Sequence, residues 1–304
     1  MSNASIGKIG QAYYDSANGR TKAFFTTLLT SVQEVRECLG QAFDEMRGSR
    51  FCVRVLTRNV SEEQLCSIRY ICRGQELSCE AVIPINKQGD CIAYYGWNKK
   101  NRHTKSEHRQ QEMELLHRVT TRLGHHQHDY TGYTVEVAIA KHDWEPKDAQ
   151  DLLEIYRRTF SGYLVEFTAQ SIMDMLCSNW VSVVRSDEKI VAVAMAEIAH
   201  IESGVGDLRI CELSEVATHP DFQRRGLSHL AFGQLLQALV ESKIDVIFSE
   251  TRAASYGMMA VAHDAGLVSC GRLEQHCVIS SPYSEVSQDG VYGDLVVFAL
   301  PPAR

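Results

Sequence analysis

Residues 212–230 read Glu212-Leu-Ser-Glu-Val-Ala-Thr-His-Pro-Asp-Phe-Gln-Arg-Arg-Gly-Leu-Ser-His-Leu230. An apolar strand in this stretch breaks at Pro220 into a basic turn, which then opens a helix. Gly226 lets an anion come close to the backbone, and the first N–H groups of the helix have no acceptor inside it. The turn therefore predicts a site for the phosphates of a ligand, and a pyrophosphate suits it.

The same run resembles the acetyl-CoA signature of the GNAT superfamily of acyl-CoA N-acyltransferases. That signature is Gln/Arg-x-x-Gly-x-Gly/Ala after a strand with a His-Pro-like break, and only Ser228 departs from it. The structural alternative is an ordinary helix cap. The resemblance implies acetyl-CoA as cofactor, CoA as product, and a pyrophosphate held by Gln223, Arg224, Arg225, Gly226, Leu227, Ser228 and His229.

The composition is that of an ordinary globular protein. At 304 residues, with 44% hydrophobic and 23% charged residues, the chain has room for two domains. Its net charge of -7 disfavours a general nucleic-acid or membrane binder and favours small-molecule partners. No apolar stretch reaches membrane-spanning length, and the first residues lack a secretory h-region, so we expect a cytoplasmic location.

Metal and disulfide frameworks are not expected. The ten cysteines contain no Cys-x-x-Cys pair and fall mostly within apolar patterns, which predicts buried free thiols. Residues 125–129 read His-His-Gln-His-Asp, but no second ligand group follows at a suitable spacing. A polar linker is therefore expected there rather than a metal site.

Residues 132–304 predict the order β-α-α-β-β-β-α-β-α-β-β. This order alone indicates a mixed α/β fold, and together with the phosphate turn it resembles a complete GNAT domain, a splayed mixed sheet flanked by helices. Residues 1–98 predict a smaller α/β unit that resembles half of a GNAT domain and lacks a cofactor turn. Residues 99–131 then form a connecting helix and linker, with a charged solvent-facing side.

The resemblance also implies how the thioester and the acceptor meet. In the family the strand before the turn offers its backbone to pantetheine, which assigns that role to Val216, Ala217 and Thr218. A general base must accept the amine proton directly or through one water, and this strand carries Glu212 and Glu215. Strand alternation puts Glu212 on one face with Ser214, Val216 and Thr218. We favour Glu212, as in histone-type members, with Glu215 second; an exposed charge or an acid that binds a cationic substrate is the alternative.

The general acid is where the sequence departs from the family. Many members carry Asn-x-x-Ala-x-x-x-Tyr-x-x-x-Gly-Phe, but Ala262 stands at the tyrosine position and Ser255 at the asparagine position. Ser255 is expected to contact the cofactor. Tyr256 is the candidate acid, with His263 as an alternative, although a thiolate can also leave without an acid.

The acceptor is suggested by a narrower resemblance. Residues 251–259, Thr-Arg-Ala-Ala-Ser-Tyr-Gly-Met-Met, together with Phe160-Ser-Gly-Tyr163, look like the β-lysine N-acetyltransferase group. A free amino acid would need a cation for its carboxylate and acids or aromatic rings for its amines. The candidates are Arg252, Tyr163, Glu197 and Glu215, although Arg252 could instead form a structural ion pair.

Three functions follow from these observations. The first is acetyl transfer from acetyl-CoA to a primary amine of a small amino acid or diamine, in a ternary complex. The second is a protein or peptide N-acetyltransferase. The third is a catalytically weak acyl-CoA sensor, which Ala262 at the tyrosine position favours. A homodimer is compatible with each.

Overall fold

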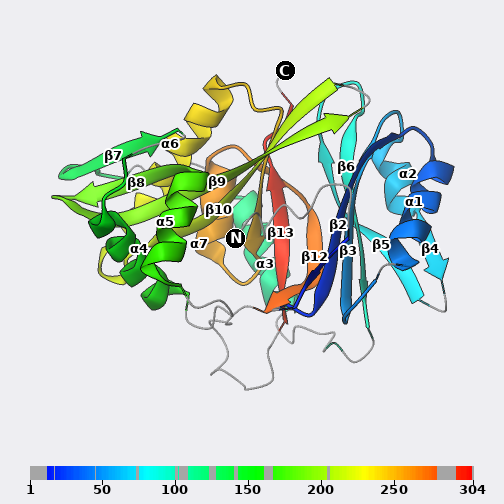
Figure 1. Cartoon of the computed structure of the whole chain (residues 1–304), viewed down its shortest axis with the longest axis horizontal. Helices are drawn as coiled ribbons and strands as arrows, with labels where there is room; N and C mark the ends of the chain where they lie inside the picture. Colours follow the sequence, from blue (N-terminus) through cyan, green and yellow to red (C-terminus); the bar gives the residue numbers. More distant parts are fainter. Residues whose placement is uncertain are drawn as a thin grey trace.

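The computed structural model describes residues 12–16, 18–44, 46–72, 75–99, 102, 109–122, 128–139, 143–160, 167–203, 206–278 and 292–302. Its strands form one sheet in the order β1-β2-β3-β6-β5-β12-β13-β11-β10-β9-β8-β7, with β4 paired to β5 outside this path. Figure 1 shows the strands of the first half of the chain on one side and β7 to β10 on the other, with β12 and β13 between them.

The first half of the chain forms six strands and two helices in its described residues. They are β1 (Tyr13–Asp15), β2 (Arg20–Leu29), α1 (Val32–Asp44), β3 (Arg50–Thr57), α2 (Glu62–Ser67), β4 (Arg69–Cys72), β5 (Gln75–Pro84) and β6 (Cys91–Asn98). A capping box at Ser61 starts α2. The helix ends at Ser67, and residues 69–72 pair with β5 as the strand β4.

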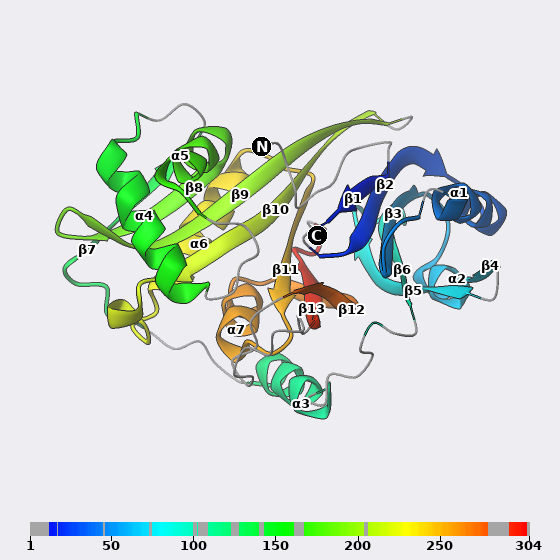
Figure 2. The same cartoon turned by 60° about the horizontal axis from the view of Figure 1, so that its bottom comes forward.

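The second half follows the order of elements that the sequence predicts. After α3 (Arg109–Thr120) come β7 (Tyr133–Ala138), α4 (Pro146–Thr159), α5 (Ala169–Ser178), β8 (Trp180–Ser186), β9 (Lys189–Ser203), β10 (Gly206–Thr218), the 3-10 turn η1 (Pro220–Phe222), α6 (Leu227–Glu241), β11 (Val246–Arg252), α7 (Tyr256–Asp264), β12 (Val268–Val278) and β13 (Tyr292–Ala299). Figure 2 shows α3 beside α7, which it contacts.

Helices cover both faces of the sheet in the second half. α4 and α5 pack on one face, where Leu152 and Tyr156 are fully buried against β8 and β9. α6 and α7 pack on the other face, where Phe232 and Leu235 contribute to a second core cluster. Nine cysteines are free thiols among the described residues, but Cys66 and Cys177 are exposed, contrary to the expected burial.

The order of the strands on one side of the sheet is the mirror image of their order on the other side. β2-β3-β6-β5 on one side is matched by β10-β11-β13-β12 on the other. In both groups the first two strands are parallel and joined by a helix, α1 or α6, and the other pairings are antiparallel. We call the part of the chain that carries β1 to β6, residues 12–98, the N-terminal unit.

The two groups of strands meet where β5 pairs with β12, at Ala81 and Gly271. Beyond this pair, side chains of the N-terminal unit and the linker bond to the backbone of β12. Arg20 donates to the carbonyl of His276 at 2.9 Å, and Arg102 donates to the carbonyl of Gln275 at 2.7 Å. These buried guanidinium groups satisfy carbonyls that would otherwise lack partners at an irregular strand end.

Gly271 makes this edge-to-edge junction possible. Its φ of 145° lies in a region that L side chains rarely adopt, and an added Cβ would collide with the carbonyl oxygen of Glu80 and the Cα of Ala81. Only glycine lets the two backbones approach so closely.

We therefore expect Gly271→Ala to lower the free energy of unfolding by about 2 kcal/mol or more, measured by chemical denaturation. Gly233→Ala is the matched control, because Gly233 lies inside α6 with no atom within 4 Å of an added Cβ. The control should be neutral or stabilising by up to about 1 kcal/mol. Equal stability of the two variants would contradict the close junction.

Candidate functional site

A bulge in β10 changes which side chains share a face. The register with β9 shifts between Ser214 and Ala217, and Glu215 within the bulge has a φ of 47°. Ala217 packs with the core under α4 and α5, whereas Val216 packs with the core under α6. The prediction that Val216 and Thr218 share the face of Glu212 is therefore wrong, because the bulge shifts the alternation by one residue.

β10 and β11 pair only over a short length. Their parallel ladder pairs residues 210–212 with residues 246–248. No other described residue of β10 has a ladder partner in β11. β11 continues to Arg252 beside β13 instead. The backbone of Val216, Ala217 and Thr218 therefore lies outside this ladder.

The predicted turn follows β10 directly. Gly226 is the N-cap of α6 with a φ of 77°, and Thr218 and Ser228 share a hydrogen bond of 2.7 Å between their hydroxyls. This bond ties the end of the strand to the first turn of the helix. The first N–H groups of α6 have no acceptor within the helix, so they are available to an anion.

Side chains from elsewhere hold the turn in position. His219 lies 3.1 Å from Glu154 and 3.0 Å from Arg158 of α4, and Arg158 also pairs with Asp221 at 3.1 Å. Arg225 donates to the hydroxyl of Tyr133 at 2.8 Å. The turn is thus fixed to α4 and β7 before any ligand binds.

The segment before β7 lies against the same glycine. The hydroxyl of Tyr130 donates to the carbonyl of Gly226 at 3.3 Å, and a Cβ on Gly226 would collide with the imidazole of His128. His128 also lies 5.4 Å from the ring of His229, which bonds to Asp264 at 3.0 Å. A residue with a Cβ at position 226 would require the His128 side chain to move. The N–H groups of the first turn of α6 are where we expect a pyrophosphate to bind.

Carboxylates gather on the face of β10 that carries Glu212. Glu212 is only 5% exposed and stands opposite Glu197 of β9. The negative charge of Glu250 of β11 repels that of Glu212. Burial and the neighbouring Glu250 raise the pKa of Glu212 to about 8, while Arg54 and Lys22 lower it. No described residue donates a hydrogen bond to the Oε2 atom of Glu212.

The remaining predicted residues are placed as follows. Ser255 caps α7 by accepting from the backbone N–H of Met258 at 3.3 Å, and Tyr256 begins the helix with its ring 5.2 Å from the guanidinium carbon of Arg118. The guanidinium carbon of Arg252 lies 5.7 Å from the ring of Phe160, at the end of α4. Ala262 is fully buried in the core. Tyr163 and residues 125–127 lie outside the described residues.

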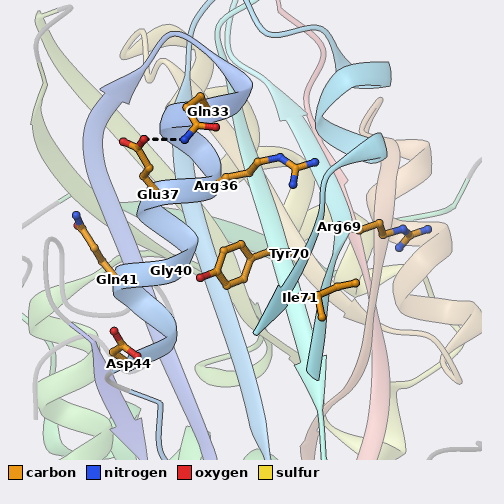
Figure 3. A pocket seen from close by; sticks show the side chains of 9 residues that line it. All are labelled: Gln33, Arg36, Glu37, Gly40, Gln41, Asp44, Arg69, Tyr70 and Ile71. Atoms are coloured by element: carbon orange, nitrogen blue, oxygen red, sulfur yellow. Dashed lines mark hydrogen bonds between the residues drawn. The ribbon is translucent and has the colours of Figure 1, made fainter. Parts of the chain in front are cut away.

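A surface hollow of about 760 Å³ lies elsewhere, between α1 and β4 (Figure 3). It is lined by polar side chains, and Gln33 and Glu37 within it are joined by a hydrogen bond of 2.8 Å. None of the predicted site residues lines this hollow. The described residues also contain no group of three metal-ligating side chains and no helix long and apolar enough to cross a bilayer.

Residues 138–266 match the model of the acetyltransferase (GNAT) family. This part of the chain has the GNAT fold. The match confirms the fold that the sequence predicts for it.

Known proteins resemble the chain over about the same extent. N-acetyltransferase YodP of Bacillus subtilis (strain 168) is 26% identical over 194 residues, which are 62% of this chain and 65% of YodP, so the chain spans less than two thirds of that relative. The ribosomal-protein-S18-alanine N-acetyltransferase of Escherichia coli is 17% identical, covering 57% of this chain and 95% of its own, with a TM-score of 0.42. The protein yncA of Salmonella typhimurium, solved with acetyl-CoA, is 16% identical, covering 56% and 94%, with a TM-score of 0.43.

Sequence reasoning missed the residues that the N-terminal unit and the linker bring to the GNAT domain. Arg54 and Lys22 of the N-terminal unit lie near Glu212, and His128 lies against Gly226. Their separation from residues 212–226 along the chain leaves no local pattern to reveal them. A run of buried arginine and lysine in the strands β2 and β3 was the available signal, since such charges are rarely buried without partners.

We expect Gly226→Ala to weaken CoA binding about tenfold or more, because the new Cβ strains the backbone at a φ of 77° and displaces His128. Isothermal titration with CoA measures this. Gly266→Ala is the control, because its φ of 91° carries a similar strain but no atom lies within 4 Å of the added Cβ. If both variants bind CoA like the unchanged protein, the turn does not hold the pyrophosphate.

Proposed function

We propose that the protein is an acetyl-CoA-dependent N-acetyltransferase that acetylates a primary amine of a small amino acid or diamine, of the β-lysine kind. The observation that carries this proposal is the buried carboxylate of Glu212 beside Glu197, on the strand that leads into the phosphate turn. Paired carboxylates attract an ammonium group, and one with a raised pKa suits a base that works near neutral pH. The N-acetyltransferase name of YodP supports the same reaction class.

The chemistry follows from these positions. Glu212 takes a proton from the acceptor ammonium, and the neutral amine attacks the thioester carbon of acetyl-CoA. The new N–C bond forms as the C–S bond breaks, the sulfur leaves as the thiolate of CoA, and the second proton of the amine nitrogen passes to this thiolate or to water. Because Ala262 is buried in the core, no side chain at the family's tyrosine position protonates the thiolate, and Tyr256 is the remaining candidate for that role.

The acceptor is held by groups from different elements. Arg252 is the proposed partner of an acceptor carboxylate, and Glu197 that of a second amine. Phe160, at the end of α4, lies close to Arg252, which suits an acceptor positioned between α4 and the end of β11. We further propose that residues 1–98 shape the acceptor side, that residues 99–131 connect the units, and that the enzyme works in the cytoplasm and can form a homodimer.

A second candidate function is a catalytically weak acyl-CoA sensor, which the buried Ala262 favours. Release of thiol from acetyl-CoA separates the two functions when it is measured with a panel of lysine, β-lysine, polyamines, aminoglycosides and peptides. Turnover with free amines supports the proposed enzyme. Turnover with peptides alone would indicate a peptide acetyltransferase, and tight CoA binding without turnover would indicate the sensor.

Glu212→Gln should lower kcat by about a hundredfold or more, because the amide cannot accept the amine proton. In the unchanged enzyme kcat/KM should rise with pH up to about pH 8, where Glu212 becomes ionised, and the variant should lose this rise. Glu202→Gln, on an exposed part of β9, serves as the control and should behave like the unchanged enzyme. A larger loss in Glu215→Gln than in Glu212→Gln would assign the base to Glu215.

Arg252→Ala should raise the KM for the acceptor about tenfold and leave the KM for acetyl-CoA unchanged, because it removes a charged partner of the acceptor carboxylate. For acceptors without a carboxylate, the KM should change little in this variant. Steady-state kinetics with lysine and with its decarboxylated diamine compare the two cases. An equal rise in the KM for acetyl-CoA would show that Arg252 does not bind the acceptor.

A further inference from the structure

We propose that Arg54 of the N-terminal unit is a positioning residue for acetyl transfer, because it holds the carboxylates of Glu212 and Glu250 next to each other for the acceptor ammonium. This inference rests on the proposed function. It gives the N-terminal unit a direct part in the reaction, although that unit has no cofactor turn of its own.

Arg54 reaches the GNAT domain from the middle of β3. Its side chain is 3% exposed, and one terminal nitrogen lies 2.7 Å from Oε1 of Glu250 and 3.9 Å from Oε2 of Glu212. The guanidinium carbon lies 4.9 Å from the ring of Tyr94 and 5.5 Å from the ring of Phe248. Two aromatic rings, one from each part of the chain, therefore fix the guanidinium between the two carboxylates.

The charges around Glu212 come from every element packed near it. Negative or ionisable groups are contributed by β6, β9, β10, β11 and β12, and cations by β2 and β3; they are Glu197, Cys211, Glu250, Tyr94, His276, Lys22 and Arg54. Two cations thus face three carboxylates, and Lys22 is itself only 4% exposed. Removing either cation would leave the buried carboxylates with a strong mutual repulsion.

The contact with Glu212 differs from an ordinary structural ion pair. Arg54 makes its short hydrogen bond to Glu250, while its nitrogen stays 3.9 Å from Glu212, beyond hydrogen-bond distance. The Oε2 atom of Glu212 accepts no hydrogen bond from the described residues. By contrast Arg50, on the same strand, donates to both carboxylate oxygens of Glu80. Arg54 therefore keeps Glu212 in place and leaves its oxygen able to accept a proton.

The electrostatic consequence has a definite sign. Burial and Glu250 raise the pKa of Glu212 to about 8, and among the groups that lower this pKa the charge of Arg54 has the largest effect. Without Arg54 the pKa of Glu212 rises further, so the base becomes ionised only at a higher pH. The rising limb of kcat/KM must then move to higher pH.

The test compares Arg54→Met, Arg54→Lys and the control Arg50→Met in the full chain, with the amine that the unchanged enzyme acetylates best. Arg54→Met should move the rising limb up by about one pH unit and lower kcat/KM at pH 7.5 about tenfold, with the KM for acetyl-CoA unchanged. In Arg54→Lys, which keeps the positive charge, the rising limb should stay close to its pH in the unchanged enzyme. Arg50→Met, equally buried and paired with Glu80, should lose stability without moving the limb. If the rising limb of kcat/KM lies at the same pH in Arg54→Met as in the unchanged enzyme, the inference is overturned.

A second readout needs no turnover. The folded state binds a proton at Glu212 that the unfolded state releases near pH 4.5, so the free energy of unfolding falls as pH rises from about 4.5 to about 8. Glu212→Gln should flatten this fall, and Arg54→Met should extend it to higher pH. If the unchanged protein acetylates no amine, the proposed function fails, while these curves still decide whether Arg54 acts on Glu212. Unchanged curves in both variants would refute that link.

Discussion

The burial of Glu212 is the constraint on which the arrangement of the two parts depends. A carboxylate that is 5% exposed beside Glu250 and Glu197 is costly unless cations face it. The GNAT domain provides the acids, and β2 and β3 of the N-terminal unit provide Lys22 and Arg54. The acids of one part and the cations of the other compensate each other where the two groups of strands form one continuous sheet.

The geometry of β10 links this charged cluster to the cofactor turn. The strand pairs with β11 as far as Glu212 and then diverges, passes through the bulge at Glu215, and ends at Thr218, which bonds to Ser228 in the first turn of α6. One strand therefore carries the proposed base, the backbone proposed to bind pantetheine and the turn proposed to bind the pyrophosphate, in that order. That order matches the order of amine, thioester and pyrophosphate in the proposed ternary complex.

Local signals allowed the fold of the second half and its turn to be predicted. The break at Pro220 and the positive φ of Gly226 follow from residue types, and the alternating apolar patterns gave the order of strands and helices. The side-chain faces after Ser214 were predicted wrongly, because a bulge depends on pairing with β9 and leaves no clear mark in the sequence. Arg54 was not predicted, because its contact with Glu250 joins residues 196 positions apart. Such contacts come from tertiary packing rather than from periodicity.

The most direct measurement is a crystal structure of the full chain with a covalent conjugate of CoA and the α- or ε-amine of lysine. The account predicts a pyrophosphate on the N–H groups of residues 226–229, with the former amine nitrogen about 3 Å from a carboxylate oxygen of Glu212 or one water away from it. Arg54 should still bridge Glu212 and Glu250. A lysine moiety bound on the α6 face of β10, or a Glu212 turned away from it with Arg54 remote, would contradict the account.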